Sequence, residues 1–582
     1  MKKLVLSTVL VSCAMVSSAQ VKLQRDNVDE ILKSMTLEEK ATLVVGTSRQ
    51  GATGGIQNAN GMVGAHADAV PGAAGTTQPI IRLGVPASVL TDGPAGVRIS
   101  PTRPNDSKTY YCTGFPVGTA LACTWNQELV EEVGKAIGNE VLEYGCDVIL
   151  APGMNIHRSP LCGRNFEYYS EDPVVTGKMG AAYVRGVQSQ GVGTSVKHFA
   201  ANSQETNRTE VDEIVSQRAL REIYLKGFEI AVREGKPWTV MSSYNKINGT
   251  YTQESKDLLT TILRDEWGFD GIVMTDWTGQ RNTAAQIMAG NDLMEPGTTA
   301  QTQEIIDKVK SGELAEADLD ICVRRVLEFI VKTPRFAGYE YSDKPDLKAH
   351  AQVTRKAATE GMVLLKNDGV LPLAKGKKVA IVGPNANSYW SMLGDYTFQS
   401  MQLFFHRHEV DAASLNIPTF LEEFSKSYNG NIASSRGCDW SSLNDIRISE
   451  GGDARIRNVV RKIESPDPTD WKAAIRTAAE SDVIIAAMGE NIYLSGENRT
   501  RNGIRLPGEQ EQFVKELEAT GKPVILVVFG GHPQVIDAVA DGCSAIVQAW
   551  FPGEEGGHAL TDILTGKVNP SGKLPFTFPV SL

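Results

Sequence analysis

The chain has 582 residues, of which 41% are hydrophobic and 22% charged, so its composition is that of a globular protein with packed cores. Its formal net charge of −11 argues against a nucleic-acid-binding surface and leaves a neutral or polar substrate open. This length allows roughly three to five domains, or fewer if one is a large α/β barrel.

The first 19 residues have the pattern of a secretory signal peptide. Lys2 and Lys3 precede an apolar core, and the small residues 17–19 form a cleavage site. The pattern predicts export to the periplasm or the medium. The segment around Cys13 is also similar to a lipobox, so a lipid anchor at Cys13 is a less favoured alternative.

Cysteine and histidine usage predicts neither a disulfide framework nor a metal site. The chain has eight cysteines and eight histidines, and no C-x-x-C pair occurs. No metal is therefore expected.

Between about residues 85 and 300, short apolar runs rich in β-branched residues alternate with helical patterns. A capping box at 36–39 opens a helix ahead of this region, amphipathic helices are predicted at 124–145 and 216–235, and helical sequence at 303–333 closes it. The apolar runs cover 84–93, 146–156, 191–199, 238–245 and 271–279. Such alternation is typical of a parallel sheet covered on both faces, and its length favours a (β/α)₈ TIM-like barrel, assigned to residues 20–335.

Polar side chains stand at or just beyond the ends of these predicted strands. They are Asp92, Arg164, Lys197 with His198, Tyr244 with Asn245, and Asp276. The carboxyl ends of barrel strands meet at one rim, so these groups are expected to converge there. Carboxylates, cations and an adjacent tryptophan suit a neutral polyhydroxyl ligand.

A second α/β pattern occupies residues 356–582, after a predicted linker at 336–355. Its apolar strands are expected within 377–387, 482–490, 523–531 and 544–557, so this domain is predicted to be an α/β sandwich. The turn 382–387 lacks the G-x-G-x-x-G spacing, and no nucleotide cofactor is expected.

The residues alone allow two interpretations of Asp276. It could cap the N-terminus of a helix, or it could supply one of the two carboxyl groups that hydrolysis of an acetal requires. Candidates for the second carboxyl group are Glu167, Asp172 and Glu205 in the barrel, and Glu497 in a long polar segment of the second domain. The residues alone leave this choice open.

From about residue 30 to its end, the chain resembles glycoside hydrolase family 3, of the β-glucosidase type. The motifs that carry the resemblance stand in order. They are MTLEEKATL (35–43), LTDGPAGVR (90–98), APGMNIHRSPLCGRNFEYYSEDP (151–173), KHFAANSQETNR (197–208), VMSSYNKINGT (240–250), VMTDWTG (273–279), AGNDLMEPG (289–297), EGMVLLKNDGVLPL (360–373), SGENRTRNGIRLPGEQ (495–510), WFPGEEGG (550–557) and SGKLPFTFP (571–579).

The resemblance implies a retaining exo-β-glycosidase that releases a non-reducing terminal β-D-glucosyl residue from oligosaccharides or glucosides. By that resemblance Asp276 is the nucleophile, and Glu497 is the general acid/base, contributed across the domain interface. Implied substrate-binding residues are Asp92, Arg158, Arg164, Lys197, His198, Tyr244 and Trp277. No cofactor and no nucleic-acid partner are implied, and a homodimer is left open.

The double-displacement mechanism makes demands on both carboxyl groups. Asp276 is expected to be ionised, with its pKa depressed by nearby cations, while Glu497 is expected to keep a proton near neutral pH. Because the two groups belong to different domains, separating the halves near residue 345 should abolish turnover.

Two features depart from the family pattern. Glu295 stands where an apolar residue is usual and is expected to face solvent or a neighbouring loop. The fibronectin-III-like domain that many relatives carry is also expected to be absent. Alternatives to a β-glucosidase are a β-xylosidase or α-arabinosidase of the same family, or a catalytically impaired carbohydrate-binding relic. Linkage preference is expected to depend on the loops 54–77 and 395–410.

Overall fold

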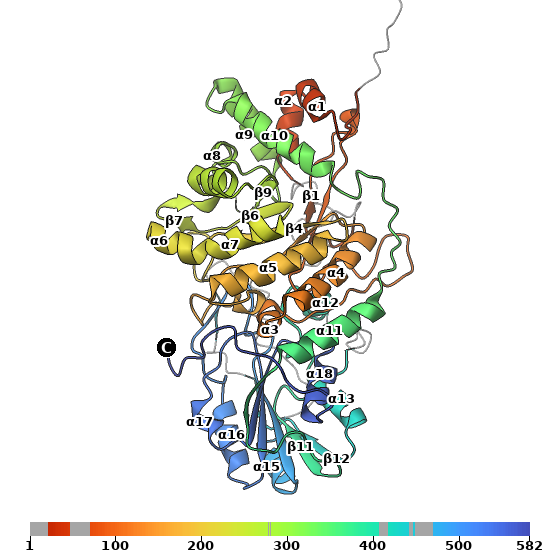
Figure 1. The fold of residues 1–582 in the computed structure, drawn as a ribbon, viewed down its shortest axis with the longest axis vertical. Helices are drawn as coiled ribbons and strands as arrows, with labels where there is room; N and C mark the ends of the chain where they lie inside the picture. The colour runs from red at the N-terminus through yellow and green to blue at the C-terminus, as the bar shows by residue number, and fades with distance from the viewer. Residues whose placement is uncertain are drawn as a thin grey trace, which may run out of the picture.

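A computed structural model describes residues 21–46, 70–277, 279, 281–406, 417–440, 446–448 and 469–582. The predicted signal peptide and most of the predicted linkage loop 54–77 lie outside these residues. Figure 1 shows the N-terminal α/β domain, coloured red to green, above a second α/β domain that ends in blue. Among the described helices, none is long and apolar enough to cross a membrane.

The N-terminal domain is built around a six-stranded sheet in the order β1-β2-β3-β4-β6-β9. These strands are β1 (Gly75–Thr76), β2 (Val89–Asp92), β3 (Val148–Leu150), β4 (Gly193–Phe199), β6 (Thr239–Ser242) and β9 (Ile272–Thr275). The predicted apolar runs contain β2, β3, β4, β6 and β9, one strand in each run, and these five strands are parallel to one another. Only β1 pairs antiparallel, with β2. Near-continuous burial on both faces explains why the runs are mostly apolar.

The sheet continues past β9 through single-residue parallel bridges. Met274 bridges Leu293, and Val45 bridges Met294, so the sheet curves round toward the N-terminal segment. The domain is therefore TIM-like, as predicted, although one strand is antiparallel and these last positions form bridges in place of full strands. A small separate sheet joins β5 (Asp212–Glu213), β7 (Lys246–Ile247) and β8 (Thr250–Tyr251).

Helices cover the sheet where the sequence predicts them. Thr36 forms the predicted capping box with Glu39 at the start of α2. The predicted helix 216–235 is present. Its α-helical parts, 217–219 and 226–230, are each followed by a π-helical stretch, at 220–224 and 231–235. The described α-helices of this domain are α1 (Val28–Ser34), α2 (Leu37–Leu43), α3 (Gly118–Cys123), α4 (Gln127–Glu143), α5 (Pro173–Gln188), α6 (Gln217–Ala219), α7 (Lys226–Ile230), α8 (Thr283–Ala289), α9 (Thr299–Ser311) and α10 (Glu316–Ile330). A further helix, Asp257–Glu266, is π-helical.

The second domain has its own six-stranded sheet, in the order β10-β17-β16-β14-β11-β12. These strands are β10 (Val363–Asn367), β11 (Lys378–Val382), β12 (Asn431–Ser435), β14 (Val483–Gly489), β16 (Val524–Phe529) and β17 (Ala545–Trp550). All are parallel except β10. Its helices are α12 (Phe398–His406), α13 (Phe420–Ser427), α15 (Trp471–Ala479), α16 (Gln510–Glu518), α17 (Asp537–Ala540) and α18 (Gly556–Leu564). A two-stranded sheet pairs β13 (Ile446–Ile448) with β15 (Arg499–Arg501).

The second half of the predicted linker 336–355 is helical. Helix α11 (Leu347–Gly361) begins at Leu347, where the side chain of Asp346 accepts a hydrogen bond from Ala349 N. It packs against α4 of the first domain and α18 of the second. At its end, a Cβ on Gly361 would lie 2.5 Å from the carbonyl oxygen of Ala120, so only glycine permits this approach. This helix therefore joins the two domains through direct packing (Figure 1).

Strand β9, which leads to Asp276, is held by a buried ion pair. Asp292 accepts hydrogen bonds from Arg264 at 2.5 Å and from Val273 N at 2.8 Å, and its other oxygen lies 3.0 Å from Arg325. Asp292→Ala leaves the buried guanidinium of Arg264 without its carboxylate partner and Val273 N without this acceptor. We expect it to lower the free energy of unfolding by about 3–5 kcal/mol, measured by denaturant titration.

Glu222→Ala supplies the control, because Glu222 forms an exposed i,i+4 pair with Arg218. Its expected cost is below about 1 kcal/mol. Equal costs for the two substitutions would contradict the role given to Asp292.

Candidate active site

The predicted rim residues converge at the carboxyl ends of the barrel strands. Lys197 Nζ lies 3.4 Å from Asp92 Oδ1, and His198 Nε2 lies 3.6 Å from Asp276 Oδ2. The hydroxyl of Tyr244 donates to the carbonyl oxygen of Trp277 at 2.5 Å. Lys197, His198, Tyr244 and Asp276 are buried, and Asp92 and Trp277 are partly exposed. Side chains from four different strand ends therefore meet in one buried polar cluster.

Asp276 directly follows β9 and is not a helix N-cap. Helix α8 begins later and is capped by Asn282, whose side chain accepts from Ala285 N. Asp276 Oδ1 accepts from Trp277 N at 2.6 Å, while Oδ2 has no hydrogen-bond partner among the described residues. The carboxyl group thus has one oxygen held by the backbone and one directed into the site.

Burial raises the pKa of Asp276, and Arg164, Arg208 and Lys197 offset this only in part. The expectation of a depressed pKa at Asp276 is therefore wrong. The physical reason is that loss of hydration disfavours the charged form more strongly than these cations favour it.

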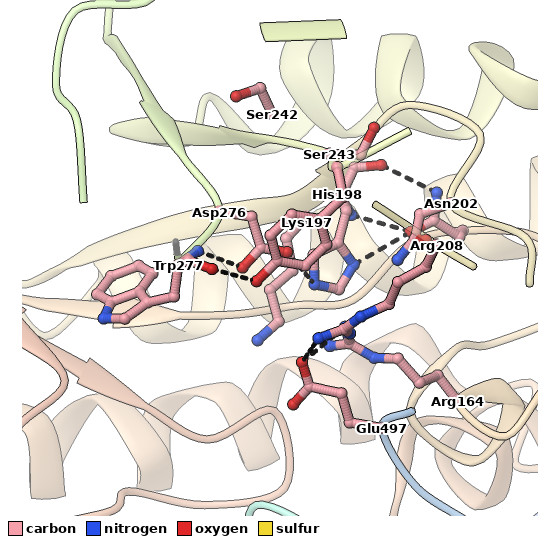
Figure 2. A network of polar contacts seen from close by, with 12 residues as sticks. Arg164, Lys197, His198, Asn202, Arg208, Ser242, Ser243, Asp276, Trp277 and Glu497 are labelled. Carbon is pink, nitrogen blue, oxygen red and sulfur yellow. Dashed lines mark hydrogen bonds and ion pairs between the residues drawn. The ribbon is translucent and has the colours of Figure 1, made fainter. Parts of the chain in front are cut away.

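Glu497 enters the same cluster from the second domain, in the segment that follows β14. It forms an ion pair with Arg208 and accepts a hydrogen bond from Tyr396 at 2.6 Å, and Arg164 Nη1 lies 3.9 Å away. Figure 2 shows Lys197, Arg164 and Arg208 between the carboxyl groups of Asp276 and Glu497.

The pKa of Glu497 is lowered in this arrangement. Burial raises it, but Arg208, Arg164 and the Tyr396 hydroxyl outweigh burial. The expectation that Glu497 keeps a proton near neutral pH is therefore wrong. The expectation came from the mechanism alone, which does not reveal that the guanidinium groups of Arg208 and Arg164 lie beside Glu497.

The other predicted residues divide between the cluster and its surroundings. Arg164 is buried and forms an ion pair with Glu167 inside their common loop. Arg164 also faces Glu497. Arg158 is exposed and donates to the hydroxyl of Tyr224 at 3.2 Å, so the structure does not bring it into the cluster. Asp172 caps α5 through Val174 N.

Sequence reasoning missed three residues that contact the predicted ones. Arg98 lies 3.0 Å from Asp92, Arg208 pairs with Glu497, and Tyr396 donates to Glu497. Arg98 and Arg208 end two of the motifs quoted above, so their signal was present in the sequence. Tyr396 stood in a segment assigned only to linkage preference.

The acid/base candidate is held by backbone pairing between the two domains, here called the seam and made of residues 161–163 and 496–501. Gly496 N donates to Gly163 O at 2.7 Å, Gly163 N to Arg499 O at 3.1 Å, and Arg501 N to Leu161 O at 3.0 Å. A Cβ on Gly163 would lie 2.1 Å from the Arg499 carbonyl oxygen. The seam therefore places Glu497 against the barrel by main-chain hydrogen bonds.

Glu205, a candidate acid from the sequence, supports the seam. Its Oε2 accepts from Asn498 N at 2.7 Å and lies 3.2 Å from Arg208 Nη1. Glu205 is fully buried, and burial raises its pKa. It fixes the residue next to Glu497 and orients the arginine that pairs with Glu497.

Family models match both domains. The model of the glycosyl hydrolase family 3 N terminal domain matches residues 73–329, and that of the family 3 C-terminal domain matches residues 362–582. The structure of β-glucosidase 3B from Thermotoga neapolitana in complex with glucose is 42% identical, with a TM-score of 0.81, over 96% of this chain and 76% of that one. The chain belongs to glycoside hydrolase family 3.

Curated relatives of this family 3 chain carry more than one activity name. It is 36% identical to the thermostable β-glucosidase B of Acetivibrio thermocellus and 34% identical to an exo-α-(1→6)-L-arabinopyranosidase of Bifidobacterium longum. The matches cover 96% and 95% of this chain and 66% of each relative. The chain thus spans about two thirds of the length of these relatives.

The side chain of Glu295, which departs from the family pattern, is buried. The expectation that it faces solvent is therefore wrong. Both carboxyl oxygens lack a partner among the described residues, and burial raises its pKa well above the ordinary value. A Cβ on Gly46 would lie 2.2 Å from one of these oxygens. The chain bends back so that the N-terminal segment covers this position.

Within the described residues, no group of His, Cys, Asp or Glu side chains could hold a metal ion.

Glu490, at the end of β14, should make the stability of this family 3 chain depend on pH. Burial raises its pKa, but Arg501 and His532 outweigh burial and lower the pKa from 4.5 to about 2. A lowered folded-state pKa stabilises the fold above the unfolded value and loses this contribution as pH falls toward the folded value. We therefore expect the melting temperature to fall between pH 4.5 and about 2 more steeply in the wild type than in Glu490→Gln. Parallel curves from thermal melts would contradict this assignment.

Proposed function

We propose that this chain is a retaining exo-acting β-glucosidase. The observation that carries the proposal is that Asp276 and Glu497, from two domains, face one buried cluster of Arg164, Lys197 and Arg208. Two carboxyl groups that face one site are what hydrolysis of a glycosidic bond requires. The names of the relatives support glucose as the sugar.

In the first step Asp276 Oδ2 attacks the anomeric carbon, and the bond to the leaving oxygen breaks as Glu497 gives that oxygen a proton. In the second step Glu497 takes a proton from water, the water oxygen bonds to the anomeric carbon, and Asp276 leaves. The bond from Trp277 N holds Asp276 Oδ1 throughout. The two proton transfers cancel, so the enzyme returns to its starting state.

The resting ion pairs must change when substrate enters. Glu497 is a carboxylate beside Arg208, so before the first step it takes up one proton from solvent, as sugar hydroxyls take up the arginine's hydrogen bonds. His198 is buried beside cations, which lowers its pKa well below the ordinary value. It is therefore a neutral hydrogen-bonding group in the site. Asp92 accepts sugar hydroxyls while Arg98 and Lys197 keep it ionised.

The test is turnover of matched aryl β-glucoside, β-xyloside, α-arabinoside and β-N-acetylglucosaminide, with Asp276→Ala as the blank. Fastest turnover of the β-glucoside, absent from the blank, is expected. Faster turnover of the α-arabinoside or the β-xyloside would instead support the alternative activity, an α-arabinosidase or β-xylosidase. The arabinopyranosidase relative favours the first of these. Silence of folded protein on all four would overturn the proposal and favour the relic.

We also propose that the chain is exported, on the basis of residues 1–19, which lie outside the described residues. The measurement is the mass of the mature chain after fractionation of expressing cells. Cleavage after residue 19 is expected. A lipid-modified Cys13 at the new N-terminus would support the anchored alternative.

A further inference from the structure

The segment that carries Glu497 is held at both of its ends by one buried carboxylate. Ser495 Oγ donates to Glu490 Oε2 at 3.0 Å, and Arg501 Nη1 lies 3.0 Å from Glu490 Oε1. Ser495 and Arg501 flank Glu497 on either side, and Glu490 is 1% exposed. Glu490 therefore closes the segment into a fixed loop.

His532 joins this carboxylate to the barrel. Its Nδ1 lies 3.1 Å from Glu490 Oε2, and its Nε2 lies 2.7 Å from the carbonyl oxygen of Cys162. A carbonyl oxygen only accepts, so Nε2 carries a proton and donates it. Cys162 pairs directly with Thr500 in the seam. One imidazole thus connects the loop of the acid/base with the barrel residue on which that loop lies.

The turn that carries His532 fits tightly against the barrel. It follows β16, and a Cβ on Gly531 would lie 2.3 Å from Cβ of Phe166. His532 is itself 1% exposed. No room remains at Gly531 for a larger side chain, so the imidazole is fixed relative to both domains.

We propose that His532, together with Glu490, is a positioning residue for the general acid/base Glu497. The proposal rests on the proposed β-glucosidase function. Their contacts go to Ser495, Arg501 and Cys162, so they act on Glu497 through the main chain of the seam. An acid must lie within hydrogen-bond reach of the leaving oxygen, and a displacement of about 1 Å costs on the order of 10²-fold in rate.

A test that isolates this role compares leaving groups. Methyl β-glucoside needs protonation of its leaving oxygen, whereas 2,4-dinitrophenyl β-glucoside departs without it. We expect His532→Ala to lower kcat/KM for the methyl glucoside by about 10- to 100-fold and for the dinitrophenyl glucoside by less than about threefold. His532→Gln keeps a donor toward Cys162 and should recover part of the loss.

Two further variants keep the test decisive. Glu490→Gln should show the same leaving-group split, and it serves if His532→Ala fails to fold. His558→Ala is the matched control, because His558 lies on α18 and pairs with Glu423 and Glu555. Its ratio of the two kcat/KM values should equal that of the wild type.

Equal losses on both glucosides in folded His532 and Glu490 variants would overturn the positioning role and leave the proposed function standing. No loss on either glucoside would also overturn it. Wild-type protein that turns over neither glucoside would overturn the proposed function itself, and the positioning role with it. The wild-type assay therefore separates the two failures.

Discussion

Asp276→Ala is expected to lower kcat/KM for an aryl β-glucoside by about 10⁴-fold or more, the scale on which enzymes lose activity when a nucleophile is removed. The side chain stands at the end of β9 with Oδ1 fixed by Trp277 N and Oδ2 free to react. No other described carboxyl group shares that placement. Asp92, the nearest rival on the rim, is already paired with Arg98 and Lys197.

The covalent intermediate gives a direct readout. A 2-deoxy-2-fluoro-β-glucoside with an activated leaving group should label wild-type protein at Asp276, as seen by mass spectrometry of the digested chain. Asp276→Asn should stay unlabelled. Asp172→Ala is the control, since Asp172 caps α5, and it should be labelled as the wild type is. Label on any other carboxylate would refute the assignment of the nucleophile.

Gly163→Ala is expected to reduce kcat/KM for a poor leaving group by about 10²-fold or more, although the residue carries no reactive group. The added Cβ would lie 2.1 Å from Arg499 O and 2.5 Å from Gly496 O, so the seam must open. Opening moves Glu497 away from the barrel while Asp276 stays in place. The measurement is the pair of kcat/KM values for methyl and 2,4-dinitrophenyl β-glucoside.

Gly503→Ala is the matched control, because a Cβ there meets no atom within 4 Å and the residue lies just beyond the seam. It should leave both kcat/KM values unchanged. Wild-type activity in Gly163→Ala would mean that the seam does not set the position of Glu497. Separation of the chain near residue 345 removes the seam entirely, and loss of turnover there stays a prediction.

The fold could be predicted from the sequence because its strands are buried on both faces. Burial of this kind requires continuous apolar runs, and each predicted run from 84–93 to 271–279 contains a parallel strand. The rim residues followed from the same argument, since parallel strands end at one edge. The antiparallel β1 carried no such signal, because it has only two residues.

What the sequence did not reveal depends on contacts between distant segments. Glu497 was chosen only through the resemblance, because it lies in a loop whose position is set by the seam. The directions of the pKa shifts at Asp276 and Glu497 were wrong, because burial and Arg208 are properties of the assembled site. Glu295 is buried against Gly46, more than two hundred residues away in the chain.

The seam also bears on how such a protein can diversify. Its hydrogen bonds join main-chain atoms, so residues such as Leu161 and Thr500 can change identity without changing the bonds. Glycines at 163 and 496 are the exceptions, because a side chain at either position would collide with the opposite strand or its neighbours. Most side chains along the seam are therefore free to vary, while the two domains must be inherited as a matched pair.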